Sequence, residues 1–484
     1  MTKHDQKVVS QQHSVQTRDI AFAVCLKVQK DHAFSNLLLP AVLEKSSCTA
    51  HEKAYITDLV YGTLRWQGFC DAVIAANMKR SLSQLDTPVL IILRLATYQA
   101  LFMATPDYAV ASTYVLLAKK QGLSRQAKFI NAVLRKIVMR SRQEWESILV
   151  SRIPKDHSNE RLAVRYSHPL WIVNKLSESV NYTNQRLQQE KNTPLLSLPD
   201  ILAMDNQPPT VSLALRPGIL SEKDLRQQVP HRAEIQKGEW SPYAYHVKGI
   251  SPNLLPGITN GSIGVEDEGS QLAALTLACA PLPVPMHEDR WLDLCAGPGG
   301  KTAILASIAR QRGITVTANE ISAHRADLVR QNIRQLRETI TQITVRDGRD
   351  YSPEKDGLFD RILVDAPCSG LGVLRRRPEA RWTKTEEDVY ELTLLQQQLL
   401  ETAITLLKPG GLLAYVTCSP VLEETVTVVD SVCHCHQQIE RYDTVQALHR
   451  VCPHIPVASH GDVQLFTEPH HTDMMFISLL TRHA

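Results

Sequence analysis

From about residue 259 onward, segments with the pattern of β-strands alternate with helical segments, and this alternation constrains the fold more than any other feature. The strand-like "RWLDLCA" leads into the helical "KTAILASIARQRG", and the alternation continues through "DRILVDAPCSG", a long helical segment and "GGLLAYVTCSP". Strands that alternate with helices in this way form parallel sheets covered on both faces. The sequence therefore predicts a doubly wound α/β domain of the Rossmann-like type over residues 259–484, with ligands at the carboxyl ends of its strands.

A glycine-rich loop, residues 294–302, follows the first of these strands. Its glycines let the backbone approach a ligand closely and open a helix whose N–H groups face that ligand. The loop is not a P-loop, because Cys295 stands where the first glycine is required, and it is not the dinucleotide fingerprint, because Thr302 replaces its last glycine. A nucleotide-type ligand remains, and Glu320 at the end of the second strand is placed to accept hydrogen bonds from ribose hydroxyls.

Two cysteines follow two further strands of the predicted sheet. Cys368 comes just after the fourth strand, in "VDAPCSG", and Cys418 just after the fifth, in "VTCSP". Either cysteine taken alone is explained by a structural role. Because both strand ends border the same ligand crevice, however, the pair together favours thiol chemistry.

The first half of the chain has a different pattern. A polar tail is expected over residues 1–15, and apolar residues at three- and four-residue intervals predict a helical bundle over 16–145, with breaks at Pro88 and Pro106. Residues 160–258 mix a helix entered through Pro169 with strand-like runs, which predicts a small α+β subdomain. Three folded parts agree with the length of 484 residues, which corresponds to roughly two to four domains.

Composition excludes several classes of protein. No apolar run approaches the roughly 20 residues of a membrane span, and the polar N-terminus lacks the pattern of a secretory signal, so we expect a cytoplasmic protein. As a separate expectation, the protein is a monomer. Ten cysteines in 484 residues are too few for a disulfide scaffold. The one cluster, "CHCH" at 433–436, lacks a second ligand pair at suitable spacing, and we expect no metal.

The net charge of +3 hides an uneven distribution. Residues 1–150 contain 19 Lys and Arg against 11 Asp and Glu, whereas residues 251–484 contain 21 against 29. A basic N-terminal part followed by an acidic C-terminal part favours an anionic partner that binds to the N-terminal part. Solvated surface charge explains the same imbalance equally well.

Particular motifs resemble known families. In the first half, "LVYGTLR", "ILRLATYQALFM", "PDYAVAS" and "KFINAVLRKI" resemble the RNA-binding bundle of the antitermination factor NusB. In the last part, "LDLCAGPGGKT", "DAPCSG" and "TCSP" together resemble the RNA 5-methylcytosine methyltransferases that use S-adenosylmethionine, whose catalytic domain follows a small RNA-recognition-like subdomain. The combination resembles the bacterial 16S ribosomal RNA cytosine-C5 methyltransferases of the Sun/Fmu (RsmB) type.

The resemblance implies roles for the two thiols. Cys418 would add to C6 of the cytosine so that C5 can attack the methyl group, and Cys368 would assist proton removal and product release. Nothing in the spacing itself says which thiol attacks. Lys301 is a candidate cation for stabilising the Cys418 thiolate, and Asp365 is placed to bind the N3/N4 edge of the base.

The resemblance also implies binding residues. The residues expected to bind the cofactor are Cys295, Ala296, Gly297, Pro298, Gly299, Gly300, Lys301, Glu320, Asp347 and Asp365. The residues expected to contact RNA are Arg375, Arg376, Arg377 and Arg381 of "RRRPEARW", and Lys128 and Arg135 among the basic residues Lys119, Lys120, Arg125, Lys128, Arg135 and Lys136 of the bundle.

Three alternatives stay open. The same reaction could act on transfer RNA or on another ribosomal site, because the motifs do not identify the substrate. A third alternative is a non-catalytic RNA-binding assembly factor that keeps the fold as a scaffold, although the presence of both cysteines with Asp365 argues against it. An amino-methyltransferase is disfavoured, because "DAPCS" replaces the "[DN]-P-P-[YF]" loop of that class.

Overall fold

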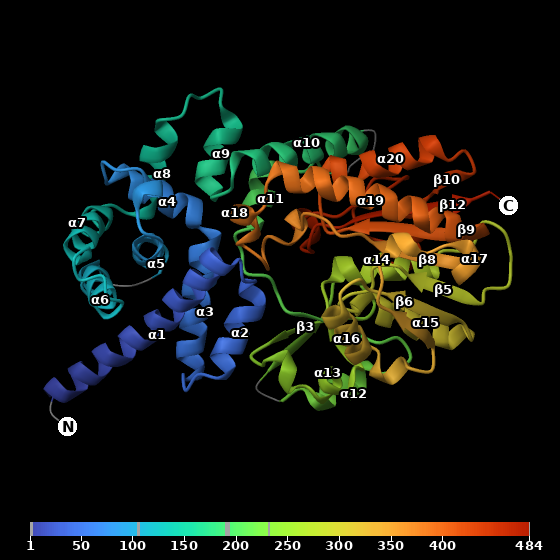
Figure 1. The fold of residues 1–484 in the computed structure, drawn as a ribbon, viewed down its shortest axis with the longest axis horizontal. Helices are drawn as coiled ribbons and strands as arrows, with labels where there is room; N and C mark the ends of the chain where they lie inside the picture. The colour runs from blue at the N-terminus through green and yellow to red at the C-terminus, as the bar shows by residue number, and fades with distance from the viewer. Residues whose placement is uncertain (1–2, 104–106, 189–193, 231–232, 484) are drawn as a thin grey trace. The chain divides into compact units, whose positions relative to one another are not determined.

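The computed structural model describes residues 3–103, 107–188, 194–230 and 233–483 (Figure 1). The chain divides into two compact units. The first, here called the helical unit, comprises residues 1–174, 205–207 and 374–384, and the second, the sheet unit, comprises 175–204, 208–373 and 385–484.

The helical unit is a bundle, as the apolar periodicity predicts. Its helices are α1 (Lys3–Asp31), α2 (Ser35–Glu44), α3 (Ala50–Arg65), α4 (Gln67–Ala76), α5 (Thr87–Phe102), α6 (Asp107–Lys120), α7 (Ala127–Ile137), α8 (Arg142–Ser151), α9 (Ser158–Tyr166) and the short α18 (Ala380–Thr383), with the 3-10 turn η1 (Leu82–Gln84). α10 (Leu170–Leu187) begins in this unit and continues in the sheet unit. The buried α5 contributes the centre of the core.

Local sequence explains where several of these helices begin. Thr49 and Ser141 form capping boxes with Glu52 and Glu144, and these start α3 and α8. The expected break at Pro88 is confirmed, since this proline lies in the first turn of α5. The break expected at Pro106 lies outside the described residues. Helix α1 begins at Lys3, so residues 3–15 of the segment expected as a polar tail are helical.

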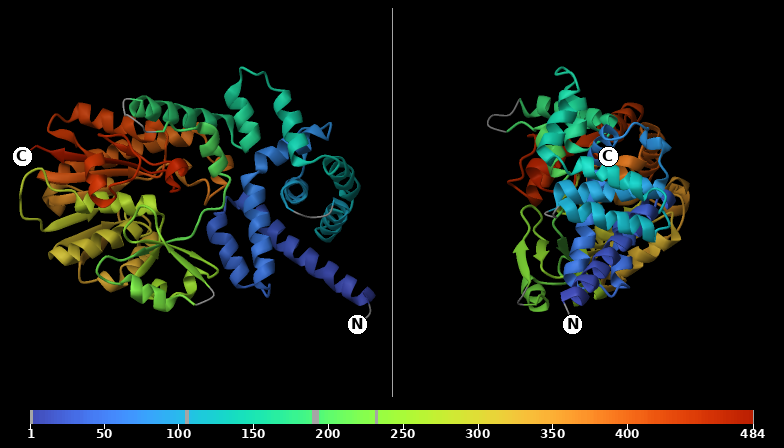
Figure 2. Two further views of the ribbon diagram at one scale, coloured as in Figure 1. Left: turned by 180° about the vertical axis from the view of Figure 1, so that it is seen from behind. Right: turned by 90° about the vertical axis from the view of Figure 1, so that its left-hand side faces the viewer.

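The sheet unit contains a small antiparallel sheet in the order β2-β3-β1-β4 (Figure 2). Its elements are β1 (Ser212–Leu215), β2 (Glu234–Lys237), β3 (Ala244–Lys248) and β4 (Ile263–Val265), with helices α11 (Leu198–Met204), α12 (Glu222–Gln228) and α13 (Pro256–Asn260) and the turn η2 (Pro252–Leu254). β1 and β3 are the strands expected from sequence. β4 pairs with β1 through Leu213 and Val265, so this sheet extends past the boundary expected at residue 258.

The large sheet has the order β10-β12-β9-β8-β5-β6-β7, and β11 pairs with β12. Its strands are β5 (Arg290–Asp293), β6 (Thr315–Asn319), β7 (Ile340–Thr344), β8 (Phe359–Asp365), β9 (Leu407–Thr417), β10 (Ile439–Tyr442), β11 (Val463–Gln464) and β12 (Phe476–Arg482). β5 to β9 are parallel, as predicted, and β12 runs antiparallel to β9. The strand order reverses between β5 and β8, and such a switch point is where open α/β sheets bind ligands.

Helices cover both faces of the large sheet (Figure 1). Helices α14, α15, α16 and α21 enclose one apolar core, and α19 and α20 enclose the other. The bounds are α14 (Glu268–Cys279), α15 (Gly300–Arg312), α16 (Ala323–Asn332), α17 (Pro353–Asp356), α19 (Glu386–Leu406), α20 (Val426–Cys435), α21 (Thr444–Val451) and α22 (Thr467–His470), with turns η3 (Arg334–Leu336), η4 (Gly348–Asp350), η5 (Leu371–Val373) and η6 (Leu422–Glu424). Among the described residues, no helix has the length and apolar character needed to cross a bilayer.

Candidate active site

The glycine-rich loop lies at the carboxyl end of β5, next to the switch point, and leads into α15. Gly299 has a φ of 106°, a conformation that favours glycine, and it precedes the first helical residue. At Gly297 a Cβ atom would lie 2.2 Å from Glu320 Oε2. Gly297 and Gly299 are therefore required to be glycine, the first because a side chain has no room and the second because of its backbone conformation.

Glu320 is buried at the end of β6 and organises this loop. Its Oε2 accepts a hydrogen bond from the Gly297 N–H at 3.0 Å, and its Oε1 accepts one from the Ser322 N–H at 3.0 Å. The Arg325 guanidinium forms an ion pair with the same carboxylate at 3.4 Å. Each oxygen has a further lone pair, so the expected contact with ribose hydroxyls is compatible with these bonds.

Asp347 follows β7 at the same edge of the sheet. Its carboxylate accepts from the Arg349 N–H at 2.9 Å and pairs with Arg349 Nη2 at 2.7 Å. The hydrogen bond from the Arg349 side chain is the main cause that lowers the pKa of Asp347, which is therefore ionised at neutral pH.

Two residues at this edge were not predicted from sequence. Ile321, next to Glu320, is 64% exposed, and an exposed large apolar side chain beside a ribose-type carboxylate suits the face of a purine ring. Asp293 is buried at the end of β5 and accepts a hydrogen bond from Thr302 Oγ1 at 2.6 Å. Burial, aided by the charge of Asp365, raises the pKa of Asp293 to about 7. The signal for Ile321 was present in the sequence as an apolar residue directly after a strand-end acid.

Lys301 and Asp365 form an ion pair, with Nζ and Oδ2 2.9 Å apart. The lysine comes from the first turn of α15 and the aspartate from the end of β8. Burial disfavours the ammonium, but the Asp365 and Glu266 carboxylates outweigh it, so the pKa of Lys301 lies above its usual value. The negative charge of a Cys418 thiolate acts in the same direction, and the ammonium stabilises that thiolate reciprocally.

The structure brings the two predicted cysteines together, with Cys368 Sγ and Cys418 Sγ 3.4 Å apart. The Gly372 N–H donates to the Cys418 carbonyl at 2.9 Å, and a Cβ at Gly372 would lie 2.7 Å from that oxygen, so the loop after β8 packs tightly on the end of β9. The hydrogen bond to Cys418, together with burial, raises the pKa of Cys368 well above its usual value. The Cys368 thiol is therefore protonated at neutral pH.

The segment "RRRPEARW" lies in the helical unit, and its arginines differ in exposure. Arg381 is fully buried, and it is excluded as an RNA contact because its guanidinium is used inside the protein. Arg375 is also buried and Arg376 is half-buried. Arg377 is exposed, with its guanidinium carbon 5.4 Å from the centre of the Phe34 ring. Of the four arginines, Arg377 is the one whose side chain is open to a partner.

The basic residues expected to contact RNA from the bundle lie on the exposed face of α7 and around it. Lys128 and Arg135 are both exposed, while the opposite face of α7 buries Ile130 and Leu134. Lys120 is exposed as well but forms an ion pair with Asp19. Lys119, Arg125 and Lys136 are also exposed.

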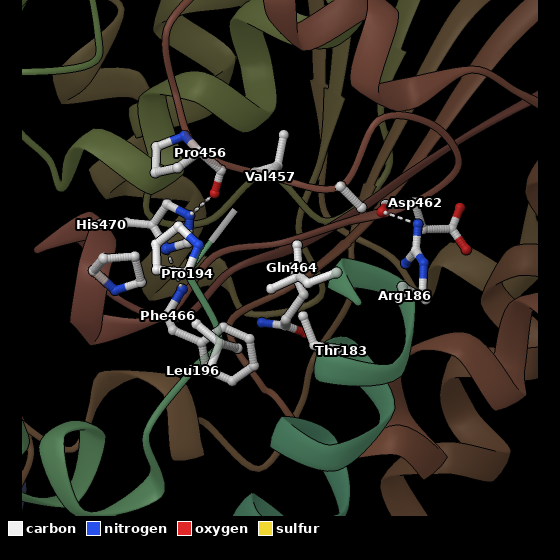
Figure 3. Close-up of a pocket in the computed structure, with 13 residues that line it drawn as sticks. Thr183, Arg186, Pro194, Leu196, Pro456, Val457, Asp462, Gln464, Phe466 and His470 are labelled. Carbon is white, nitrogen blue, oxygen red and sulfur yellow. Dashed lines mark hydrogen bonds between the residues drawn. The ribbon is translucent and has the colours of Figure 1, made fainter. Parts of the chain in front are cut away.

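A separate pocket in the sheet unit holds none of the predicted site residues (Figure 3). His470 lies on its wall, where Nδ1 accepts from the Phe466 N–H at 3.0 Å, so that Nε2 carries the proton and donates to the Pro456 carbonyl at 2.9 Å. Arg186 Nη2 donates to the carbonyls of His460 and Asp462. These side chains are engaged in structural bonds, and the pocket has no group arranged for the expected chemistry.

The "CHCH" run occupies the end of α20 and the residue after it. Within the described parts of the chain, no group of three or more His, Cys, Asp or Glu side chains is arranged to hold a metal ion.

Two stretches of the chain match models of known families. Residues 282–481 match the family model described as 16S rRNA methyltransferase RsmB/F, and residues 15–139 match that of the NusB family.

Individual proteins extend this similarity over nearly the whole chain. The chain is 40% identical over 468 residues to Rv1407 of Mycobacterium tuberculosis, whose name carries only the general term methyltransferase, and the match covers 96% of each chain. It is 29% identical over 417 residues to the ribosomal RNA small subunit methyltransferase B of Salmonella typhi, which covers 84% of this chain and 86% of that one. The crystal structure of PH0851 has the same fold, with a TM-score of 0.73 at 22% identity, over 96% of this chain and 99% of that one.

Proposed function

Because the chain belongs to the RsmB/F family of methyltransferases and carries a NusB domain at its N-terminus, we propose that it methylates C5 of a cytosine in 16S ribosomal RNA, in the cytoplasm. It is an RNA cytosine-C5 methyltransferase that uses S-adenosylmethionine. The small-subunit target is supported by the description of the matching family model and by the name of the Salmonella relative. The pair of thiols 3.4 Å apart is the observation that carries the proposed chemistry.

The residues at the edge of the sheet fit S-adenosylmethionine. A Cβ at Gly297 would collide with the Glu320 carboxylate, so the backbone of the glycine-rich loop lies directly against the group expected to bind the ribose. Glu320 would bind the ribose hydroxyls, Ile321 would cover a face of the adenine, and Asp347 would lie near its edge. When bound, S-adenosylmethionine supplies the methyl group.

In the proposed reaction the Cys418 thiolate adds to C6 of the cytosine, and an Sγ–C6 bond forms. The electron pair displaced by this addition makes C5 nucleophilic, and C5 would take up the methyl group as the bond from that group to the sulfonium sulfur breaks, with S-adenosylhomocysteine as the leaving group. The C5 proton would then pass to a water molecule with the assistance of Cys368, the electron pair of the broken C5–H bond forms the C5–C6 double bond again, and the Sγ–C6 bond breaks, which returns Cys418 as a thiolate. The cytosine must leave its stack to reach the thiols.

The surroundings of the two thiols explain their different roles. Lys301 stabilises a negative charge on Cys418, which favours this thiol as the nucleophile. Cys368 keeps its proton and lies 3.4 Å from Cys418 Sγ, so it can donate a hydrogen bond to the departing thiolate and assist release of the product. Asp365, held by Lys301, would bind the N3/N4 edge of the base.

The test uses the purified chain, methyl-labelled S-adenosylmethionine and three substrates, namely naked 16S RNA, small ribosomal subunits and transfer RNA. We expect labelled 5-methylcytidine in one of the two ribosomal substrates. Label in transfer RNA instead would overturn the target. Absence of label in all three substrates, with S-adenosylmethionine bound normally, would favour the non-catalytic assembly factor.

Two variants separate the roles of the thiols. We expect Cys418→Ala to abolish the label and Cys368→Ala to accumulate a covalent complex of protein and RNA that survives denaturing electrophoresis. A Cys418→Ala protein that still methylates RNA fully would contradict the assignment of the nucleophile.

A further inference from the structure

A buried carboxylate lies close to the two loops that carry the thiols. Glu424, in η6 after β9, has no exposed surface. Taking an ionised carboxylate out of water is costly unless hydrogen bonds compensate it. In the part of the chain that the structure describes, no Lys, Arg or His side chain pairs with Glu424, and its partners are neutral donors.

These donors come from the loops that carry the cysteines. Glu424 Oε1 accepts from the Ser369 N–H at 2.7 Å, and Oε2 accepts from Ser369 Oγ at 2.5 Å and from Ser419 Oγ at 2.6 Å. Ser369 directly follows Cys368, and Ser419 directly follows Cys418. One carboxylate therefore joins the two loops at the residue after each thiol.

Two further side chains hold Glu424 in place. Gln396 of α19 donates from Nε2 to Glu424 Oε1 at 3.2 Å and to the Pro367 carbonyl at 2.9 Å. The Tyr415 hydroxyl of β9 donates to the Glu424 carbonyl at 2.8 Å. The carboxylate is thus bonded to a long helix, and the backbone of the same residue is bonded to a central strand, so Glu424 is held by two rigid elements.

We propose that Glu424 is a positioning residue that holds Cys368 and Cys418 at reacting distance by binding the serine next to each. Chemistry that needs two thiols at one base requires their spacing to be kept to a fraction of an ångström. The backbone bond from Gly372 to Cys418 joins the two loops at one point, and a carboxylate with four acceptor positions adds bonds to both loops at the serine next to each thiol. The charge of Glu424 also contributes to raising the pKa of Cys368, which keeps that thiol protonated.

The proposal rests on the proposed two-thiol reaction, and its test has one readout that needs no RNA. In Glu424→Gln the amide has the same shape but loses the negative charge that strengthens the bonds to Ser369 and Ser419, and the hydroxyls that donate to Oε2 would have to turn and accept from the amide instead. We expect the single-turnover rate of methylation to fall by about 10- to 100-fold, the usual cost of removing an orienting partner. The affinity for S-adenosylmethionine should be unchanged. Glu401→Gln, the same change at an exposed position of α19, is the matched control.

The second readout is oxidation by diamide, which takes two protons and two electrons from the thiols and joins the two Sγ atoms. Mass spectrometry of peptides identifies the Cys368–Cys418 bond. With the thiols 3.4 Å apart, the wild type and Glu401→Gln should form this bond rapidly, and Glu424→Gln should form it about tenfold more slowly. A merely structural role far from the thiols would leave this rate unchanged.

The outcomes are distinct. Normal methylation and normal disulfide formation in Glu424→Gln would overturn the proposal, and so would lost methylation with an unchanged rate of disulfide formation. If the wild type methylates no RNA, the proposed function fails, but the disulfide rates still decide whether Glu424 positions the thiols. If Glu424→Gln does not fold, Ser419→Ala removes one link while leaving both bonds to Ser369, and it should slow both readouts.

Discussion

Arg381 is expected to stabilise the helical unit, and replacing it with methionine tests this directly. Its Nη1 donates to the carbonyls of Arg65 and Ser167 at 3.1 and 3.3 Å and to Asn206 Oδ1 at 2.7 Å, and its Nη2 donates to the Asp205 carbonyl at 2.8 Å. Burial lowers the pKa of Arg381 to about 9, so the guanidinium is still charged at neutral pH. The side chain therefore joins three separate segments of the helical unit to the segment that carries it.

The magnitude follows from these bonds. Removing one partner of a buried, hydrogen-bonded charge costs about 3–5 kcal/mol, because the remaining groups stay buried without it. Methionine fills much of the volume of the arginine side chain and removes the buried charge. We therefore expect Arg381→Met to lower the free energy of unfolding by about 3 kcal/mol. In a unit of this size each kcal/mol lowers the melting temperature by roughly 2–4 °C, which predicts a fall of about 10 °C.

The assay is thermal unfolding of the full chain, followed by circular dichroism, together with RNA binding at two salt concentrations. Arg377→Met changes an exposed arginine of the same segment and is the control, with an expected shift of less than about 2 °C. The reasoning would be refuted if Arg381→Met melted with the wild type while its RNA affinity and salt dependence fell.

Three further outcomes are expected. Lys301→Met should slow methyl transfer by about 100-fold and slow alkylation of Cys418 by iodoacetamide at neutral pH, because the cation beside the thiolate is lost; equal alkylation rates would contradict this. Burial lowers the pKa of His470 to about 4. The neutral imidazole therefore contributes about 3 kcal/mol to the free energy of unfolding above pH 6.5, and this contribution is lost as the pH falls towards 4. The free energy of unfolding of His470→Gln, measured with denaturant, should depend less steeply on pH over this range. The double variant Lys128→Ala/Arg135→Ala should weaken RNA binding and reduce the slope of log affinity against log salt by roughly 1.5, without affecting S-adenosylmethionine binding. An unchanged slope would show that α7 is not part of the RNA-binding surface.

Much of the fold and part of the site follow from local sequence patterns. Strand and helix periodicity located β5 to β9 and the bundle, because alternation of apolar residues reports which face of an element is buried. The glycines of the loop after β5 and the cysteines after β8 and β9 were found because strand ends in a parallel sheet share one edge. The predicted topology by itself therefore brings Cys368 and Cys418 near each other.

The tertiary structure alone decided what individual polar side chains do. The sequence shows Arg377 and Arg381 as members of one basic run, yet the first is exposed and the second is buried. Glu424 reads as one acid among several near η6, and only the fold places its carboxylate between the serines that follow the two thiols. The physical reason is that local patterns report which face of an element is buried, whereas the partners of a polar group are set by residues far away in the chain, and burial determines whether such a group binds solvent, RNA or the protein itself.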